Sequence, residues 1–438
     1  MLKTLRAQEL SLAICEDRLD SVLWLNGSTK FFLQRVPYYF IDKLVDCSKR
    51  LGVTSLLDVR LHDLVVTEAF ADYPIDLDFL RVYFGFILDS LLKGATSKTL
   101  HPYLLRNSLN ACSGSPTRMD LAVTYRCNNR CYFCYADCPR DTDELSTGQW
   151  FSLIDSFRDL NIPCVNFTGG EPTVRKDLVD LVARASDFTT GLTTNGRLLT
   201  KALCRDLKGA GLDYAQVTLH SLEGPHDFTC GHKGAWRETV RGIEASLAAG
   251  INTVTNCTLM RNTYLEVVEY LEFLYTLGVR QACFNGLLVS GKGKDYERDG
   301  LRLNYEETAG ALRAALVTAK TLPGMKIEWL TPTCYKRLNP RLLGLGDKCC
   351  SACSFNVTVE PWGRVIPCQS WLHEDCGNIL TDSWESIWSS SLASRARDIH
   401  VRGECYSCDF SSSCRGACPL DLSWLDDSAV AAKVPTVV

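Results

Sequence analysis

Short apolar runs alternate with longer amphipathic stretches through the middle of the chain. Each apolar run ends in a polar or glycine-containing turn, which is typical of a buried strand, and the stretches between them space apolar residues as helices do. Strands alternating with helices predict a parallel sheet covered by helices, hence an α/β fold. The predicted strands cover residues 119–124, 164–168, 191–196, 214–221, 253–259 and 281–285; the predicted helices include 176–188, 235–249, 264–277 and one that opens at Ser146 or Thr147.

Three cysteines follow the first predicted strand at the spacing C-x3-C-x2-C. They are Cys127, Cys131 and Cys134. A four-iron cluster normally takes four thiolates, one for each iron, so three cysteines leave one iron open to a small molecule. An open coordination position marks a catalytic metal site. Closely spaced cysteines in a loop also suit a zinc site, and that alternative stays open on these residues alone.

The run Gly169-Gly170-Glu171-Pro172 follows the second predicted strand. Adjacent glycines let backbone approach a ligand closely, and a neighbouring carboxylate accepts hydrogen bonds from an ammonium group. With the cysteine spacing, this run resembles the motifs of the radical S-adenosylmethionine (radical SAM) enzymes. The resemblance implies a partial (β/α)6 TIM-like barrel, a [4Fe–4S] cluster whose open iron chelates SAM, and release of a 5′-deoxyadenosyl radical. It also implies that Glu171 and the backbone of Gly169 and Gly170 hold the SAM amino group.

Polar residues at the ends of later strands complete the expected cofactor site. In barrels of this kind, active sites gather at the carboxyl ends of the strands. The resemblance implies cofactor contacts at Ser221 and Asn256, while Thr194 and Asn195 lie at the mouth of the third strand. Each of these four could instead make an ordinary hydrogen bond at a strand end. His220 titrates near neutrality, but a histidine satisfied by backbone fits equally well, so we assign it no role.

From Cys334 to Cys418 the chain carries ten cysteines. Cys353, Gly363 and Cys368 fit one half of a known pattern, and the block C-x2-C-x5-C-x3-C that ends at Cys418 fits the other half. Together they resemble the SPASM extension, which holds two auxiliary [4Fe–4S] clusters in many peptide-modifying radical SAM enzymes. Zinc sites are an alternative, whereas disulfides are disfavoured in a large chain without a secretory signal. The expected ligands are Cys334, Cys350, Cys353, Cys368, Cys405, Cys408, Cys414 and Cys418.

Two departures from the SPASM pattern leave ligands open. The pattern needs a further cysteine after its last block, and none follows Cys418, so the second auxiliary cluster lacks one thiolate. Cys376, another side chain, water or substrate could complete it. At the first auxiliary cluster four cysteines compete for two upstream places, and Cys334 is a candidate for the distal one. The competitors are Cys334, Cys349, Cys350 and Cys353.

The first hundred residues carry a different pattern. Apolar residues at 21–25 and 30–33 flank a polar turn and predict a hairpin, and apolar positions from Ile41 predict a helix that ends at Gly52. A further helix is predicted over 78–92. Strands followed by helices resemble, in pattern only, the small winged domain of the PQQ-chaperone type that binds leader peptides. The resemblance implies that a leader peptide adds as a strand to the hairpin edge; an unrelated cap over the barrel is the alternative.

These patterns divide the chain into a small N-terminal α+β domain, a partial barrel and a cysteine-rich SPASM extension. We expect the peptide-recognition domain at residues 1–100, a linker at 101–117, the barrel at 118–325, the extension at 326–425 and a tail at 426–438.

Composition narrows the partners and the compartment. A net charge of −4 provides no basic field for nucleic acid, and no apolar run approaches the roughly 18 residues of a membrane span. Twenty-two cysteines in a chain without a signal peptide indicate a reducing cytoplasm. Cysteines that stand singly are expected to be apolar fillers or spare thiols. These are Cys138, Cys164, Cys204, Cys230, Cys257 and Cys283.

The resemblance implies an oxidoreductase that takes a hydrogen atom from a substrate held beside SAM, with a flavodoxin or ferredoxin as electron donor. We expect a ribosomally made precursor peptide as substrate and a crosslink or other modification as product. Two alternatives within the family are a sulfatase-type maturase acting on a protein side chain and an enzyme acting on a porphyrin or another cofactor precursor. An iron–sulfur electron carrier is the alternative from a different class, and Glu171 with its glycines argues against it because a carrier needs no SAM pocket.

Overall fold

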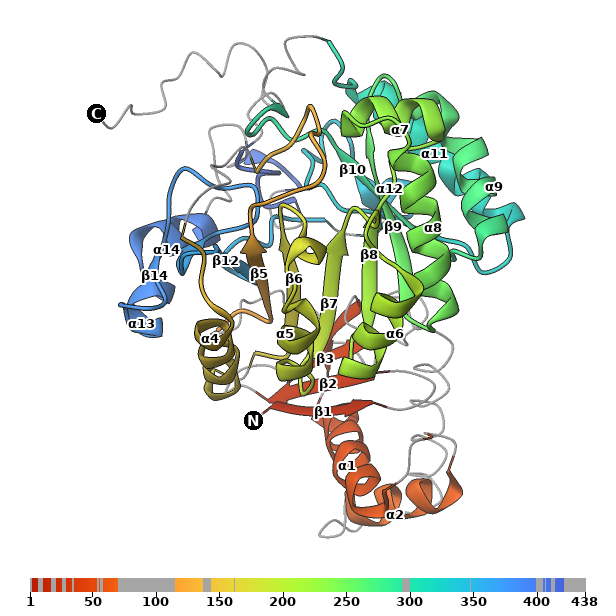
Figure 1. Cartoon of the computed structure of the whole chain (residues 1–438). Coiled ribbons are helices and arrows are strands. Elements are labelled where there is room, and N and C mark those ends of the chain that lie inside the picture. Colours follow the sequence, from red (N-terminus) through yellow and green to blue (C-terminus); the bar gives the residue numbers. More distant parts are fainter. Residues whose placement is uncertain are drawn as a thin grey trace.

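The chain is described by a computed structural model (Figure 1). The described residues are 2–6, 11–16, 21–25, 29–33, 35–52, 55, 58–69, 115–136, 143–160, 162–293, 300–346, 348–398, 405, 407–410 and 414–420. The helix predicted over 78–92, Cys138, the tail at 426–438 and most of the linker predicted over 101–117 lie outside these residues.

A parallel sheet forms the barrel, with its strands paired side by side in chain order from β5 to β11. All six predicted strands are confirmed, and β11 continues the sheet directly after residue 325, where we placed the end of the barrel. The strands are β5 (Arg118–Thr124), β6 (Cys164–Gly169), β7 (Thr189–Thr194), β8 (Tyr214–Thr218), β9 (Asn252–Leu259), β10 (Gln281–Gly286) and β11 (Lys326–Trp329).

Helices connect successive strands and cover the outer face of the sheet (Figure 1). They are α4 (Thr147–Asp159), α5 (Leu178–Arg184), α6 (Lys201–Ala210), α7 (Glu223–Cys230), α8 (Ala235–Ala248), α9 (Val267–Leu277) and α11 (Tyr305–Thr321), with short 3-10 turns η2 (Pro172–Val174) and η3 (Tyr264–Glu266). Ser146 caps α4 by accepting from the backbone N–H of Gln149, and the Gln149 side chain accepts from the Ser146 backbone N–H. The predicted helix therefore begins where its capping residue indicates.

The core lies between the strands and these helices. Strands β5 and β6 are buried at nearly every position, which explains why they read as continuous apolar runs rather than alternating ones. The largest fully buried side chains include Trp150 of α4, Phe167 of β6 and Trp329 of β11. Because all strands of the barrel are parallel, their carboxyl ends meet at one end of the sheet, and the predicted motifs follow those ends.

The C-terminal extension continues the same sheet beyond β5. Strand β12 (Asn356–Val359) pairs in parallel with β5, and β13 (Arg364–Ile366) and β14 (Gly377–Asn378) follow it in antiparallel pairing. The helices of this region are α12 (Pro340–Leu343), α13 (Trp384–Trp388) and α14 (Ser391–Asp398). The first strand of the barrel, β5, thus pairs directly with the extension. The expected α/β class with a cysteine-rich addition is confirmed.

The N-terminal region forms its own antiparallel sheet in the order β1-β2-β3-β4. Its elements are β1 (Leu2–Arg6), β2 (Ser11–Glu16), β3 (Ser21–Leu25), β4 (Thr29–Leu33), α1 (Arg35–Leu51) and α2 (Val59–Ala69). The predicted hairpin is confirmed as β3 and β4, whereas β1 and β2 were not predicted. Helix α1 starts earlier than expected, at Arg35. Pro37 lies in its first turn, where proline is tolerated. Strand β2 contacts β7, and Figure 1 shows this sheet where the barrel strands begin, away from their carboxyl ends.

Candidate cluster and cofactor site

The C-x3-C-x2-C loop follows β5 and is anchored by backbone on two sides. Its three cysteines are half-buried. The backbone N–H of Arg130 donates to the carbonyl oxygen of Cys230 at the end of α7 (3.1 Å), and the N–H of Lys292 donates to the carbonyl oxygen of Cys134 (3.1 Å). The loop is thus held in place by contacts with the chain after β8 and after β10.

Gly169 and Gly170 lie against the backbone that leads from β5 into the cysteine loop. Gly169 has a φ of 138°, and a Cβ on it would stand 2.1 Å from the carbonyl oxygen of Thr124. A Cβ on Gly170 would stand 2.5 Å from the carbonyl oxygen of Tyr125. Both positions therefore require glycine. The close approach that we predicted for a ligand is made here to the start of the cysteine loop.

Glu171 is fully buried and joins the ends of β6 and β7. Its Oε1 accepts from the backbone N–H (3.0 Å) and hydroxyl (2.5 Å) of Thr173 and from the hydroxyl of Thr194 (2.7 Å), and its Oε2 accepts from the backbone N–H of Asn195 (2.7 Å). Burial raises the pKa of Glu171, and these hydrogen bonds oppose the rise. The structure brings together five of the predicted cofactor residues: Gly169, Gly170, Glu171, Thr194 and Asn195.

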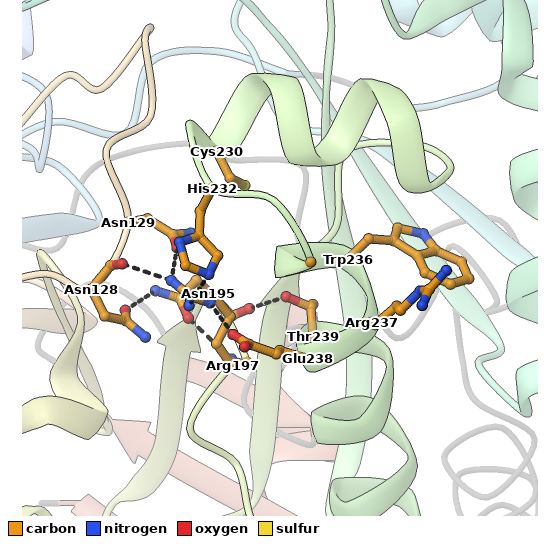
Figure 2. A network of polar contacts seen from close by, with 12 residues as sticks. Asn128, Asn129, Asn195, Arg197, Cys230, His232, Trp236, Arg237, Glu238 and Thr239 are labelled. Carbon is orange, nitrogen blue, oxygen red and sulfur yellow. Dashed lines mark hydrogen bonds and ion pairs between the residues drawn. The ribbon is translucent and has the colours of Figure 1, made fainter.

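Arg197 ties the turn after β7 to the cysteine loop (Figure 2). Its Nη1 donates to the carbonyl oxygen of Asn128 (2.6 Å) and to Oδ1 of Asn129 (2.7 Å), two residues between Cys127 and Cys131. Its Nε pairs with Oε2 of Glu238 at 2.5 Å, and its Nη2 lies 2.8 Å from Nε2 of His232. The guanidinium is almost wholly buried, so these bonds act with little competition from water.

Asn195 extends this network on the side of Cys127. Its Nδ2 donates to Oδ1 of Asn128 (2.7 Å) and lies 4.0 Å from Sγ of Cys127, and its carbonyl oxygen accepts from the hydroxyl of Thr239 (2.9 Å). Arg197 and Glu238 were not predicted, because charged residues after a strand and on a helix are usually solvated. An arginine directly after the Asn195-Gly196 turn is the only sequence signal that could have found the network.

Ser221 and Asn256, the other two predicted cofactor residues, each have a partner. The Ser221 hydroxyl donates to Oε2 of Glu266 (2.7 Å), and Oδ1 of Asn256 accepts from Nδ2 of Asn285 (2.8 Å). Ser221 has a φ of 71°, which costs a non-glycine residue on the order of 1–3 kcal/mol and is typical of functional sites. Ser221 follows β8, and Asn256 lies on the neighbouring strand β9. Neither residue takes part in the hydrogen bonds of Glu171 described above.

His220 is buried and satisfied by backbone on one side. Its Nδ1 accepts from the N–H of Thr258 (3.2 Å), so the proton lies on Nε2, which has no partner among the described residues. Its ring meets Phe133 of the cysteine loop edge-on, with centroids 5.0 Å apart. Burial lowers the pKa of His220 well below 6.5, so the ring is neutral at physiological pH.

Cys230 is not an isolated filler. The neighbouring Cys230 thiol, together with burial, raises the pKa of Cys131. Its Sγ also lies 3.5 Å from Nε2 of His226. The other single cysteines that the structure describes are buried, as expected: Cys164, Cys204, Cys257 and Cys283.

The cysteines of the extension fall into two groups. One group contains Cys353 and Cys376, whose Sγ atoms lie 3.8 Å apart. It also contains Cys368, whose pKa is raised to about 12 by burial and by the neighbouring Cys350. In the other, Cys334 packs against a buried cluster formed by Tyr335, Cys414 and Ala417. That Cys334 supplies the distal ligand of the first auxiliary cluster stays a prediction.

The barrel and the extension meet beside the cysteines. The residue after Cys134, Tyr135, donates a hydrogen bond to Gln369, the residue after Cys368, and the hydroxyl of Ser290 donates to the carbonyl oxygen of Ser370 (2.8 Å). These contacts bring the first cysteine loop next to the extension.

No group of three or more cysteine, histidine or carboxylate side chains in the described part of the chain closes around a single ion. The ligands of a cubane each bind a different iron and stand further apart than ligands of one ion. An anchored loop with three half-buried thiols, beside a buried carboxylate and a glycine turn, is a donor set that fits such a cluster and a small zwitterionic cofactor.

Fold and site together define an α/β barrel enzyme with a cysteine-held centre at the carboxyl ends of its strands. The chain belongs to the radical SAM superfamily: residues 121–274 match the Radical SAM superfamily, and residues 349–414 match SPASM, the iron–sulfur cluster-binding domain. This membership implies a [4Fe–4S] cluster with SAM in the barrel and auxiliary iron–sulfur clusters in the extension.

Relatives of the chain act on different substrates. It is 28% identical over 361 residues to Fe-coproporphyrin III synthase of Methanosarcina barkeri, covering 75% of this chain and 88% of that protein. It is 30% identical over 321 residues to mycofactocin maturase MftC of Mycobacterium tuberculosis, covering 69% of this chain and 78% of that protein. Among solved structures, SuiB of Streptococcus suis bound to SAM has a TM-score of 0.66 at 14% identity and covers 97% of this chain and 98% of its own.

In the part of the chain that the structure describes, no helix has both the length and the apolar character of a membrane span.

Proposed function

We propose that this enzyme is a maturase that modifies a ribosomally made precursor peptide, forming a crosslink or a similar product. The observation that carries this proposal is the N-terminal sheet β1–β4 with helices α1 and α2, which precedes the barrel. The fold shared with SuiB extends over 96–97% of the chain and so includes this region, and SuiB is also known in a structure with its precursor peptide SuiA.

Cys127, Cys131 and Cys134 are the proposed ligands of the [4Fe–4S] cluster in the barrel. When bound, this cluster and SAM supply a 5′-deoxyadenosyl radical that removes a hydrogen atom from the substrate, and the auxiliary clusters supply an electron acceptor. Arg197 and Asn195 hold the loop that carries the three thiols, and the glycine turn keeps β6 against it.

The remaining proposed cofactor residues surround the same position. Glu171 orients the ends of β6 and β7 and places a negative charge that favours the SAM ammonium, with Thr194 and Asn195 at its side. Ser221 and Asn256 are proposed polar contacts to the remainder of SAM. His220 and Phe133 exclude water from this end of the barrel, since both rings pack together and His220 is fully buried.

The proposed auxiliary sites use the two cysteine groups of the extension. Cys350, Cys353, Cys368 and Cys418 are assigned to the first site, and Cys405, Cys408 and Cys414 to the second. A small electron-transfer protein such as flavodoxin or ferredoxin is the proposed donor, and we propose the cytoplasm as the compartment because iron–sulfur ligands must stay reduced.

Action on a cofactor precursor is the second candidate. It is favoured by the similarity to Fe-coproporphyrin III synthase, which extends over 361 residues. That candidate does not explain the N-terminal sheet, in which β1 and β4 are the edge strands among the described residues, whereas an extended peptide can pair with an edge strand.

Binding measurements separate the two candidates. Fluorescence anisotropy of labelled precursor peptides encoded beside the gene should give saturable binding to the intact enzyme and none after removal of residues 1–100, while SAM cleavage without product continues. Peptide affinity that survives the truncation contradicts the recognition role. Tight binding of an iron porphyrin without any peptide binding supports the second candidate.

A further inference from the structure

The last cysteine block of the extension provides three of the four thiolates that a [4Fe–4S] cluster normally takes. They belong to Cys405, Cys408 and Cys414, since Cys418 is assigned to the first auxiliary site. The fourth ligand therefore comes from outside this block.

The segment after β11 brings a cysteine to this block. Cys334 packs against a buried cluster formed by Tyr335, Cys414 and Ala417. The Sγ of Cys414 lies 3.3 Å from the carbonyl oxygen of Thr333, the residue before Cys334. The packing of Cys334 and the bond between Cys414 and the preceding residue, Thr333, thus place Cys334 beside the last block.

The position of Cys334 is fixed by its own backbone. Its carbonyl oxygen accepts from the N–H groups of Arg337 and Leu338, both at 2.9 Å, which closes a tight turn. Cys334 lies five residues after the end of β11, and this turn fixes the backbone that carries its thiol. This rigidity suits a cluster ligand.

Cys376, the other cysteine considered as the fourth ligand, lies beside a cysteine of the first group. The Sγ of Cys376 lies 3.8 Å from that of Cys353, and both side chains are buried. Cys376 follows β13 and directly precedes β14, the two strands that continue the sheet beyond β12. It therefore belongs with the first cysteine group and is not available to the last block.

We propose that Cys334 is the fourth ligand of the second auxiliary cluster, together with Cys405, Cys408 and Cys414. This inference rests on the proposed pair of auxiliary clusters and deepens it. With four protein thiolates the cluster has no open iron, so it transfers electrons and does not bind a substrate thiolate. Cys334 precedes the last cysteine block in the sequence, whereas the SPASM pattern takes the corresponding ligand from a residue after that block.

The test uses the full chain with Cys127, Cys131 and Cys134 replaced by alanine, reconstituted anaerobically so that only auxiliary clusters remain. This parent should hold about eight irons and show two reduced-state EPR signals. Adding Cys334→Ala should lower the iron to between about four and seven and remove the same EPR signal that Cys408→Ala removes. The double variant should lose no more iron than either single one, because both residues serve one cluster.

Two further variants keep the result interpretable. Cys334→Ser, which offers an oxygen ligand, should retain iron with a shifted EPR spectrum, and Cys204→Ala in the buried face of α6 should match the parent. Full iron and an unchanged spectrum in Cys334→Ala overturn the inference, as does loss of the Cys408-dependent signal in Cys376→Ala instead. A parent that binds no iron contradicts the auxiliary clusters themselves and not the ligand assignment alone.

Discussion

The phenolic oxygen of Tyr135 donates a hydrogen bond to Oε1 of Gln369, 2.8 Å away and 234 residues further along the chain. Tyr135 directly follows Cys134, and Gln369 directly follows Cys368. The hydroxyl of Thr168, at the end of β6, approaches the same amide oxygen at 3.4 Å. One amide therefore connects the first cysteine loop, the strand before the glycine turn and a cysteine of the extension. The spacing between the two proposed cluster sites is held at this point.

Removing this hydroxyl should loosen the junction without removing a cluster ligand. We expect Tyr135→Phe to lower the free energy of unfolding by about 1 kcal/mol, the usual net value of one hydrogen bond. Iron content should stay at the wild-type value, while the ratio of modified product to 5′-deoxyadenosine falls. Tyr132→Phe, at an exposed ring in the same loop, is the matched control and should leave both quantities unchanged. An unaltered product ratio in Tyr135→Phe contradicts a role for this bond in placing the substrate.

Arg197 should be necessary for the first cluster. Each hydrogen bond from a charged donor contributes about 1.5–3 kcal/mol, and Arg197→Ala removes two of them from the loop between Cys127 and Cys131. We expect deoxyadenosine formation to fall more than about tenfold and the iron of the first cluster to be partly lost. Arg197→Lys should recover part of both, because an ammonium group can replace only some of the contacts.

The control for Arg197 lies on the neighbouring helix α8. Arg237 points away from the network in Figure 2, and its side chain is 71% exposed in an ion pair with Glu223. Such surface pairs contribute little. Arg237→Ala should therefore keep wild-type iron and activity, and equal losses in both arginine variants would show that the effect is one of general stability.

Glu171→Gln should weaken SAM binding while the first cluster remains. The carboxylate accepts from four donors, and a glutamine amide would turn its NH2 group toward at least one of them. Loss of the charge and of one charged hydrogen bond predicts at least about a tenfold rise in the Kd for SAM, measured by equilibrium dialysis. Glu269→Gln on the exposed face of α9 is the control. Unchanged SAM affinity in Glu171→Gln would refute our assignment of this carboxylate.

Acidification should destabilise the fold through His226. Its Nδ1 accepts from the backbone N–H of His220 (2.9 Å), and burial lowers its pKa from 6.5 to about 4. In the unfolded chain His226 binds a proton below pH 6.5, whereas in the folded protein it binds one only below about pH 4. Stability is therefore complete above pH 6.5 and is lost as the pH falls, by about 2 kcal/mol at pH 5 from this residue. Urea unfolding at pH 7 and pH 5 should show a smaller decrease in His226→Asn, and an equal decrease in both proteins would exclude His226 as a cause.

The sequence predicted the strands of the barrel well because they are buried on both faces. Runs such as 164–168 have no solvent side, so their apolar character is continuous and their polar ends are sharp. The glycine turn was predicted from the need for a close backbone approach to a ligand, whereas a Cβ at position 169 would meet the carbonyl oxygen of Thr124, at the end of β5. The N-terminal hairpin was found, but β1 and β2 were not.

The missed residues share a physical reason. Arg197 and Cys230 act through contacts between distant strands and helices, and no local spacing marks an arginine as buried or a single cysteine as a neighbour of Cys131. The ligand role of Cys334 stays a prediction, because cysteine spacing follows the chain, whereas ligand sets form between segments that are distant in the sequence. The path of the backbone after β11, and not the count of residues, brings Cys334 to Cys414.

The most direct test of the whole account is iron per chain together with 5′-deoxyadenosine formed, on anaerobically reconstituted enzyme with SAM and dithionite. We predict about twelve irons, from three cubanes, and steady deoxyadenosine formation that Cys131→Ala abolishes while about eight irons remain. Zinc in place of iron, or full clusters that release no deoxyadenosine under any reductant, would contradict the assignment of this chain as a working radical SAM enzyme.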